Sequence, residues 1–582
     1  MQEKALLLTG DYPSRDDRRA ERLLEFFAVR YEKRRVTEFA LGEPTKKHRL
    51  MCAAQTFSHL AEGLRNSSTG PNGLAQRVHS AFLYSNGDSV ALENIVRQLS
   101  GANIPVRRGA KSQTQWHIVD EPDGMCGAMR GLHVRPAATT LSNCDFFERN
   151  ENSATPLIVS DDKTAFLKVA RGGIPFFISS VPLLDVDAEL MTRNFDVRDH
   201  LFSAVPVVSY IRWAFPRGSW NAPEASACLV IDDPLLKARY GFVRFRELLT
   251  LMTQLRFSTS IAFIPWNWRR SNPKIVQLFK DNPDHYSLCI HGCDHTAGEF
   301  SASDRRRLRA VASEAVRRMS LHERRTGLAH DRIMVFPQGL FSSEAIGALK
   351  GSGFHAAVNT EVHSNPPGTH KLRISDVWDV AVMTYSDFPI YTRRYPAQGI
   401  ENFAFDLLLG KPCLVVIHHD FCGDGYAQLS HFIGQLNALQ APMVWRSLGD
   451  VLRRSYRQRE VSPDSIEIEM YGSELLIENR SERAKSYFVR RREPHPNSIE
   501  TLQAGSRQLC WQAVGNYIQF KLELGPGENT LLTLRFKVAE DVAHGPPNFI
   551  HRTKTMLRRH LSEARDNYLV PAKARIVAFS RS

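Results

Sequence analysis

The chain has 582 residues, 43% of them hydrophobic, and a formal net charge of +13. Its length predicts several domains, and no stretch reaches the roughly 18 apolar residues of a membrane-spanning helix. A basic chain can favour anionic partners, but the Lys and Arg residues are dispersed, so net charge alone does not predict a nucleic-acid partner.

The cysteines predict a reducing compartment. There are nine, an odd number, and most lie in apolar runs without a paired framework, which is typical of buried free thiols. The apolar segment near Met1 is too short for a signal peptide. We therefore expect a cytoplasmic location. No feature of the sequence predicts an oligomeric state.

Residues 1–215 are predicted to form a separate α/β domain. Apolar runs at 5–10 and 78–84 predict buried strands, and helical periodicity follows at 16–29 and 88–99. This alternation favours an open parallel sheet, loosely similar to flavodoxin-like or glutamine-amidotransferase-like domains. No nucleophile elbow, Cys–His pair or Gly-rich phosphate loop is evident there, so we expect a structural, regulatory or substrate-positioning role.

Further strands or hairpins are predicted at residues 155–160, 164–171 and 174–178. Residues 217–223 (Arg-Gly-Ser-Trp-Asn-Ala-Pro) carry turn-forming residues and are predicted to link the first domain to the next.

Three apolar strands of the central region end in residues that can bind a metal. Residues 227–231 precede Asp232 and Asp233, residues 286–290 precede His291 and His295, and residues 413–417 precede His418. Barrels and open α/β sheets place their chemistry at the C-terminal ends of strands. Two His and one carboxylate commonly bind Zn²⁺ or another divalent metal and leave a position for water.

Simpler interpretations exist for each motif alone. An Asp-Asp pair at a strand end is most often a turn or a helix cap, and two His four residues apart are most often surface or core residues. Finding both in order after apolar strands favours a site. Cys289 and Cys293 interleave with the two His and raise a structural-zinc alternative, although Cys289 would face the core and such sites need four ligands.

The region 223–451 resembles the polysaccharide deacetylase family, the NodB-homology or carbohydrate esterase 4-like proteins. Asp232-Asp233 looks like the family's Thr-Phe-Asp-Asp motif, with Val and Ile in place of Thr and Phe. His291 and His295 match its His-Ser/Thr-x-x-His motif, with Gly292 in place of Ser/Thr. Residues 415–418 look like its Leu-x-Leu-His motif. The resemblance implies a distorted (β/α) barrel.

One family motif is altered. Arg-x-Pro-Tyr appears here only as residues 335–339, with Val335 in place of the Arg and Gln338 in place of the aromatic. Metal binding is therefore better supported than the groups that tune catalysis.

The resemblance assigns roles to five residues. Asp233, His291 and His295 would bind a divalent metal, Zn first, with Co, Ni or Mn as alternatives. Asp232 would be the general base. His418 would be the general acid that protonates the leaving group, since its unperturbed pKa is about 6.5.

Residues from other loops would complete the site. The backbone amide of Gln338 stands where the family donates to the oxyanion, a contribution of roughly 3 kcal/mol. Arg393 or Arg394 could replace the missing Arg, although a solvated arginine pair is an equal alternative. Trp266, with Trp268, could stack on a sugar face, although packing under a loop explains it at least as well.

After residue 451 the pattern changes to short alternating strands, such as residues 465–470 and 517–524, separated by turns. A β-sandwich is predicted over 460–540. It could extend a carbohydrate cleft or serve as an interaction module. The remaining tail, 541–582, is basic and expected to be peripheral.

We therefore predict a cytosolic metal-dependent deacetylase of N- or O-acetyl groups on a sugar or polysaccharide precursor. One alternative is a catalytically silent glycan-binding barrel, motivated by the altered Arg-x-Pro-Tyr motif. The other is a metal-dependent hydrolase of a non-sugar amide C–N bond. Asp232, which is not a required ligand, favours an enzyme over a binding module.

Overall fold

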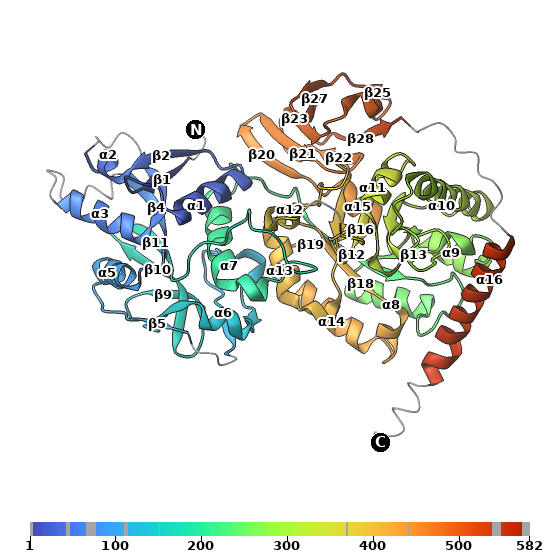
Figure 1. Ribbon diagram of the computed structural model, residues 1–582, viewed down its shortest axis with the longest axis horizontal. Coiled ribbons are helices and arrows are strands. Elements are labelled where there is room, and N and C mark those ends of the chain that lie inside the picture. Colours follow the sequence, from blue (N-terminus) through green and yellow to red (C-terminus); the bar gives the residue numbers. More distant parts are fainter. Residues whose placement is uncertain are drawn as a thin grey trace.

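A computed structural model describes residues 4–41, 47–65, 77–109, 114–150, 152–367, 371–439, 441–537 and 549–572. The protein is mixed α/β: a parallel barrel-like sheet lies beside an N-terminal sheet, and two C-terminal sheets lie above the barrel on the side toward the N-terminal sheet (Figure 1). None of the described helices is long and apolar enough to cross a membrane. The predicted boundary at residue 540 and the segment 573–582 lie outside the described residues.

The N-terminal sheet is open and mixed, with order β2-β1-β3-β4-β11-β10-β9-β6-β7. From β2 to β11 neighbouring strands are parallel, and from β11 onward they are antiparallel. Its strands are β1 (Ala5–Thr9), β2 (Tyr31–Arg35), β3 (His48–Ala53), β4 (Val78–Tyr84), β5 (Val106–Arg108), β6 (Trp116–Ile118), β7 (His133–Val134), β8 (Asp145–Glu148), β9 (Thr155–Val159), β10 (Lys163–Arg171) and β11 (Ile174–Ser179). Its helices are α1 (Arg15–Phe26), α2 (Val36–Leu41), α3 (Ala54–Arg65), α5 (Ser89–Ser100), η1 (Gly127–Met129), α6 (Ala138–Ser142) and α7 (Val197–Ala214).

The central sheet has eight strands, seven of them in the order β17-β16-β15-β14-β13-β12-β18, and every neighbouring pair is parallel. Its strands are β12 (Ala225–Asp232), β13 (Thr259–Phe263), β14 (Tyr286–His291), β15 (Ile333–Val335), β16 (Ala356–Asn359), β17 (Ile390–Thr392) and β18 (Cys413–Ile417), with β19 (Met443–Trp445) paired to β12. Just after β17, the Arg394 N–H donates to Leu414 O and its carbonyl accepts from Val416 N, both at 2.9 Å. These bonds join the two end strands, so the predicted barrel is present as a nearly closed parallel sheet.

Helices cover the outside of this ring, as expected for parallel strands joined by crossover connections. They are α8 (Phe245–Leu255), α9 (Pro273–Asp281), α10 (Arg305–Thr326), α11 (Ser343–Lys350), α12 (Ile374–Trp378), α13 (Ile400–Leu409) and α14 (Ala427–Asn437). Helix α15 (Leu448–Arg453) packs instead with the strand residues on the opposite face, such as Val230 and Cys289.

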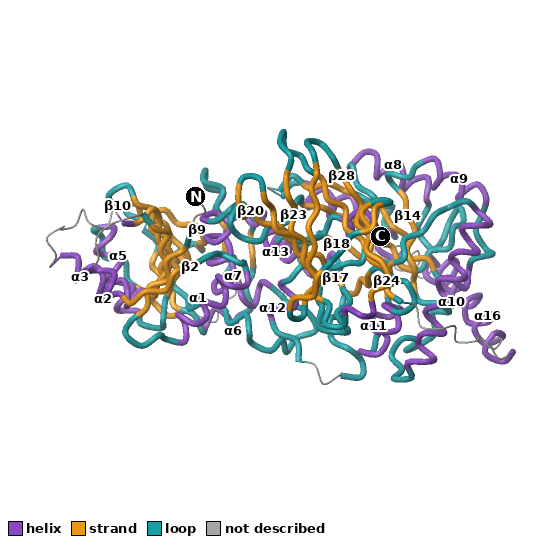
Figure 2. The backbone as a smooth tube through the Cα atoms, turned by 90° about the horizontal axis from the view of Figure 1, so that it is seen from above, coloured by secondary structure: helices purple, strands orange, loops and turns teal. Residues whose placement is uncertain are grey.

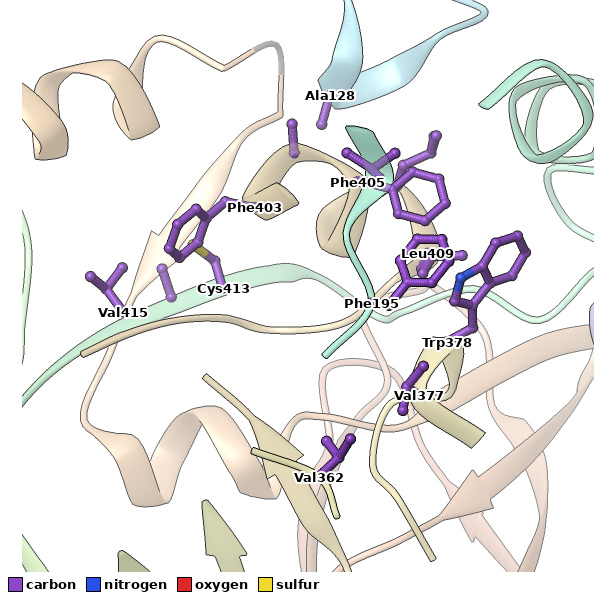
Figure 3. Packing of buried hydrophobic residues seen from close by; sticks show 14 of the residues in the cluster. Ala128, Phe195, Val362, Val377, Trp378, Phe403, Phe405, Leu409, Cys413 and Val415 are labelled. Atoms are coloured by element: carbon purple, nitrogen blue, oxygen red, sulfur yellow. The ribbon is translucent and has the colours of Figure 1, made fainter. Parts of the chain in front are cut away.

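The N-terminal sheet and the barrel share one hydrophobic core. Helix α7 contacts α13 of the barrel on one side and β4, β10 and β11 on the other. Ala128 of η1 lies near Phe405 of α13, and Phe195 and Trp378 pack on the same helix (Figure 3). The predicted linker is also fixed, since Asn221 and Gln458 exchange two backbone hydrogen bonds of 2.8 Å. The region 1–215 is therefore packed onto the barrel rather than held at a distance.

Two C-terminal sheets, with orders β20-β21-β23-β27-β26 and β22-β28-β24-β25, enclose a hydrophobic core of their own. Strand β27 alternates between buried and exposed residues, as the period-two pattern predicts. The strands are β20 (Arg457–Ser462), β21 (Ser465–Met470), β22 (Glu474–Glu478), β23 (Lys485–Arg492), β24 (Ile499–Ala504), β25 (Arg507–Gln508), β26 (Gln512–Val514), β27 (Tyr517–Leu524) and β28 (Asn529–Phe536).

The last described element is the helix α16 (Phe549–Ala564), which continues into a π-helical turn over Arg565–Leu569. In both views it lies at the end of the molecule farthest from the N-terminal sheet (Figures 1 and 2). It packs against the barrel, which differs from the expected peripheral tail.

Phe202 tests how α7 packs within the N-terminal region. Its side chain is 1% exposed, and its ring centroid lies 4.6 Å from that of Trp116 and 4.9 Å from that of Phe146. Phe202→Ala should lower the free energy of unfolding by about 3–5 kcal/mol, because it leaves a cavity. Chemical denaturation measures this, with Val90→Ala, at 64% exposure, as control. A loss in Phe202→Ala no larger than in the control would contradict the packing.

Candidate metal centre

Asp233, His291 and His295 meet at the C-terminal edge of the barrel. The Nε2 atoms of His291 and His295 lie 3.4 and 3.1 Å from Asp233 Oδ1. The Nδ1 atom of His291 donates to Val335 O at 3.0 Å, which fixes the ring and leaves Nε2 to face the carboxylate. Burial alone raises the pKa of Asp233, but the two imidazoles hold it well below its usual range.

The backbone explains how two successive Asp residues serve different purposes. Asp232 is the last residue of β12, and Asp233 has a φ of 80°, so the strand direction is broken between them. His295 also has a positive φ, of 56°. Such conformations cost of order 1–3 kcal/mol each for non-glycine residues and gather at functional sites.

Glu299, which the sequence did not single out, holds the loop that carries His295. Its carboxylate accepts hydrogen bonds from the backbone N–H groups of Cys293, Asp294 and His295 at 3.0, 2.7 and 3.2 Å. A glutamate shortly after the His motif was visible in the sequence, but its bonds depend on how the loop folds back.

The same loop requires glycine at position 292, where the resembled family has Ser/Thr. Gly292 has a φ of +63°, and a Cβ there would lie 2.4 Å from Pro337 Cγ and 2.6 Å from Glu299 Oε2.

A second group of possible ligands, Cys293, Asp294 and Glu299, is already engaged. Both oxygens of Glu299 accept backbone hydrogen bonds, and Asp294 is paired with Arg318 and with His551. Cys289 is buried with Sγ toward Ile261 O. The structural-zinc alternative therefore lacks a set of four available ligands among the described residues.

Asp232 forms a buried pair with Arg393. Two guanidinium nitrogens donate to the two carboxylate oxygens, each at 2.7 Å. Burial alone raises the pKa of Asp232, but Arg393 and His291 hold it below its usual range. Arg393 and Arg394 are only 2% and 3% exposed, so the alternative of a solvated arginine pair is wrong. Arg394 pairs instead with Asp406 at 2.6 Å.

One cavity of ≈ 510 Å³ collects most of the predicted site. Its lining includes Asp232, Asp233, His291, His295, Gln338, Arg393 and His418. The His418 ring stacks on Tyr395, with centroids 6.0 Å apart. The described lining does not include Trp266, whose ring lies 5.2 Å beneath the Arg318 guanidinium. The catalytic roles of these residues stay predictions.

The donor set fits a divalent metal. Two imidazole nitrogens and one carboxylate oxygen lie within 4.8 Å of one another. Asp233 Oδ1 is buried and has no hydrogen-bond partner among the described residues, because its contacts with the imidazoles lack hydrogen-bond geometry. A buried carboxylate oxygen without a partner is costly, and a cation shared with the two His would satisfy it. The set suits Zn²⁺ and related metals.

Helix α16 and its π-helical turn cover the cavity, a feature that sequence reasoning missed. Arg558, Arg559, Ser562, Arg565 and Asp566 belong to the cavity lining.

Paired polar contacts hold this segment on the barrel. Asp566 accepts from Tyr240 Oη at 2.8 Å and faces His419 at 3.5 Å, while Glu563 pairs with Lys237 and Arg270. Acidic residues of this segment therefore contact basic residues of the barrel. The net basic composition of the tail gave no indication of these contacts.

The protein is similar in structure to carbohydrate deacetylases. No protein-family model matches its sequence, and no curated protein does. Agd3, described as a novel carbohydrate deacetylase, shares 10% identity over 92% of this chain and 98% of its own, with a TM-score of 0.47. A family 4 carbohydrate esterase from Streptomyces lividans in complex with acetate shares 14% identity over 38% and 92%, with a TM-score of 0.24.

A third similar structure is BA3943, a CE4 family pseudoenzyme from Bacillus anthracis, with 10% identity over 40% of this chain and 66% of its own and a TM-score of 0.26. The similar structures thus include both carbohydrate deacetylases and a pseudoenzyme. The function of this chain depends on the geometry of its own site.

Gly292→Ser should disturb the His295 loop. The added side chain meets Pro337 and Glu299 on a strained backbone, so we expect a loss of about 1–3 kcal/mol in stability and ~10–100-fold weaker metal binding. Thermal unfolding and metal titration measure these effects. Gly87→Ser is the control, since Gly87 has a φ of +89° but nothing within 4 Å of its Cβ position. Equal effects in both variants would show that crowding at position 292 is unimportant.

The docking of α16 should weaken in acid. Burial raises the pKa of Asp566, but His419, Arg565 and Tyr240 lower it from 3.8 to about 2. A carboxylate with a lowered pKa stabilises the docked state above its ordinary pKa, and this contribution is lost as pH falls toward about 2. Hydrogen exchange of α16, corrected for the intrinsic rate and compared with β14, should show lost protection between pH 4 and pH 2. Unchanged protection, or the same pH dependence in Asp566→Asn, would contradict this assignment.

Proposed function

We propose that the protein is a metal-dependent deacetylase that hydrolyses N- or O-acetyl groups on a sugar or polysaccharide precursor. The observation that carries the proposal is the content of one cavity. A two-His, one-Asp donor set, a second carboxylate held by a buried Arg, and a third His all line it. Metal-assisted hydrolysis of an amide or ester uses these parts: a metal site, a base and an acid.

A divalent metal held by Asp233, His291 and His295 would polarise the acetyl carbonyl and acidify a water molecule. Asp232 is the base that takes a proton from the attacking water. Arg393 occupies one lone pair on each of its oxygens, and a carboxylate has about four such sites, so Asp232 can still accept that proton. Arg393 also keeps the carboxylate oriented and ionised.

His418 is the acid that protonates the leaving nitrogen or oxygen. It comes from the end of β18, the strand next to β12, so acid and base face the same space. Stacking on Tyr395 holds the ring plane. The backbone N–H of Gln338, a residue with a φ of 60° in the cavity lining, is the donor proposed for the oxyanion.

The silent-barrel alternative arose from the missing Arg of the altered motif. Arg393 now supplies a guanidinium to Asp232 from the loop after β17, which weakens the reason for that alternative. A cytoplasmic location stays part of the proposal, supported by nine free cysteines, of which eight are buried.

Asp232→Asn tests the assignment of the base. Loss of a positioned base should lower acetate release by ~10²–10⁴-fold, with metal content unchanged because Asp233 is the ligand. Acetate is measured with the metal-loaded protein on a panel of acetylated sugars and small amides. The exposed Asp420, just beyond His418, gives the matched control Asp420→Asn, and chelator should abolish release.

Two results would contradict the proposal. Wild-type turnover in Asp232→Asn would show that Asp232 is not the base. A loss of metal as large as the loss of activity would mean that the two Asp residues are assigned the wrong way round. Preference for small amides over every sugar would favour the non-sugar hydrolase.

A further inference from the structure

The cavity wall opposite the barrel is built by the C-terminal segment and is basic. Three of its arginines, Arg558, Arg559 and Arg565, line the cavity that holds Asp233 and the two His. A basic wall attracts anions only where its positive charges are not already paired with carboxylates. The ion-pair partners of each arginine therefore decide whether it can bind an anion.

Most arginines of the cavity are neutralised. Arg393 is paired with Asp232, Arg193 with Glu361 at 3.0 Å, and Arg565 with Asp566 at 2.7 Å. Arg558 and Arg559 differ, because neither forms an ion pair with a carboxylate anywhere in the described parts of the chain. Two adjacent arginines therefore stand beside the metal ligands without an ion-pair partner among the described residues.

Arg559 is the more constrained of the two. It is 8% exposed, and its Nε has no hydrogen-bond partner among the described residues. One terminal nitrogen lies 3.5 Å from Nδ1 of His295. His295 turns Nε2 toward Asp233, so it would bind a metal through Nε2. A neutral imidazole that binds a metal through Nε2 carries its proton on Nδ1, and His295 Nδ1 could then not accept a hydrogen bond from Arg559. A buried Nε–H without an acceptor is costly.

We propose that Arg558 and Arg559 form an anion subsite beside the metal centre, and that the substrate is an acetylated sugar bearing an acidic group. The inference rests on the proposed deacetylase function and names the class of its substrate. The planar fork of Arg suits a carboxylate or a phosphate, the two groups that it can bind through paired hydrogen bonds. Because Arg559 touches a metal ligand, the acidic group lies on the acetylated sugar or on the unit next to it.

The same contact links substrate binding to the C-terminal segment. An anion bound by Arg559 would supply an acceptor for its Nε–H, and so would favour the docked position of α16. A neutral sugar would leave the buried charge unpaired, which disfavours neutral substrates. The net charge of +13 also raises the local concentration of polyanionic chains.

Matched substrate pairs test the subsite. Each acetylated oligosaccharide is offered in its acidic form and after reduction of the carboxyl group, with a phosphorylated analogue as a third member. The wild type should prefer an acidic member. Arg559→Gln should lose ~10–100-fold of that preference, mainly through KM, since a charged hydrogen bond contributes about 1.5–3 kcal/mol. Arg559→Lys should restore part of it. Arg552→Gln, exposed on the same helix, should keep the wild-type preference.

Binding without turnover separates this inference from the proposed function. Glucuronate and inorganic phosphate are titrated into the metal-loaded protein by calorimetry, and Arg559→Gln should bind the preferred anion at least ~10-fold more weakly. Absent hydrolysis of every substrate, with this Arg-dependent binding intact, would overturn the deacetylase and leave the subsite standing. Equal hydrolysis of acidic and reduced members, or anion binding that ignores Arg559, would overturn the subsite.

Discussion

The backbone of Arg394 is the contact on which the arrangement of the site depends. Its two hydrogen bonds to β18 bring the end of β17 against the opposite edge of the sheet and nearly close the ring. Parallel strands in a closed ring direct all their C-terminal ends to one rim. Asp232, His291 and His418, which are far apart in the sequence, therefore face one cavity, and Arg393 is carried across to Asp232.

The Asp232–Arg393 pair shows what this closure contributes. A buried ion pair gives little net stability, because desolvation offsets most of the attraction, but it specifies a geometry. Here both carboxylate oxygens are held at 2.7 Å from guanidinium nitrogens. The neighbouring Asp233 has no such partner and points to the two imidazoles instead. Two successive carboxylates thus have different environments, which is the condition for different chemical roles.

Local patterns were enough to predict the strands that carry the site. A short apolar run predicts a buried strand, and the polar residue that follows the run marks its C-terminal end. The runs before Asp232-Asp233, His291 and His418 each predict a strand and its end in this way. The barrel followed from the resemblance of the same stretches to a known family. The sequence could not decide whether Arg393 or Arg394 replaces the missing Arg or whether both are solvated. The burial of Arg393 depends on the ring closure at Arg394, which no local pattern shows.

Contacts between distant segments could not be predicted. Glu299 braces three backbone amides of a loop that no periodicity describes. No prediction was made for α7, and its packing on both the N-terminal sheet and α13 depends on contacts between distant segments. The basic composition of residues 541–582 suggested a peripheral tail, whereas Glu563 and Asp566 pair with the barrel and set Arg559 against His295. Local sequence patterns do not determine which surfaces of the folded chain pack together.

Asp233, His291 and His295 are proposed to hold the metal while Asp232 stays free of it, and anomalous diffraction from crystals grown with Zn²⁺ would locate the ion. We expect one peak about 2.0–2.2 Å from the two Nε2 atoms and an Asp233 oxygen, the usual Zn–N and Zn–O distances, with Asp232 still paired to Arg393. A peak bound to Asp232, or one at Cys293 and Glu299 with none at the two imidazoles, would contradict this proposal.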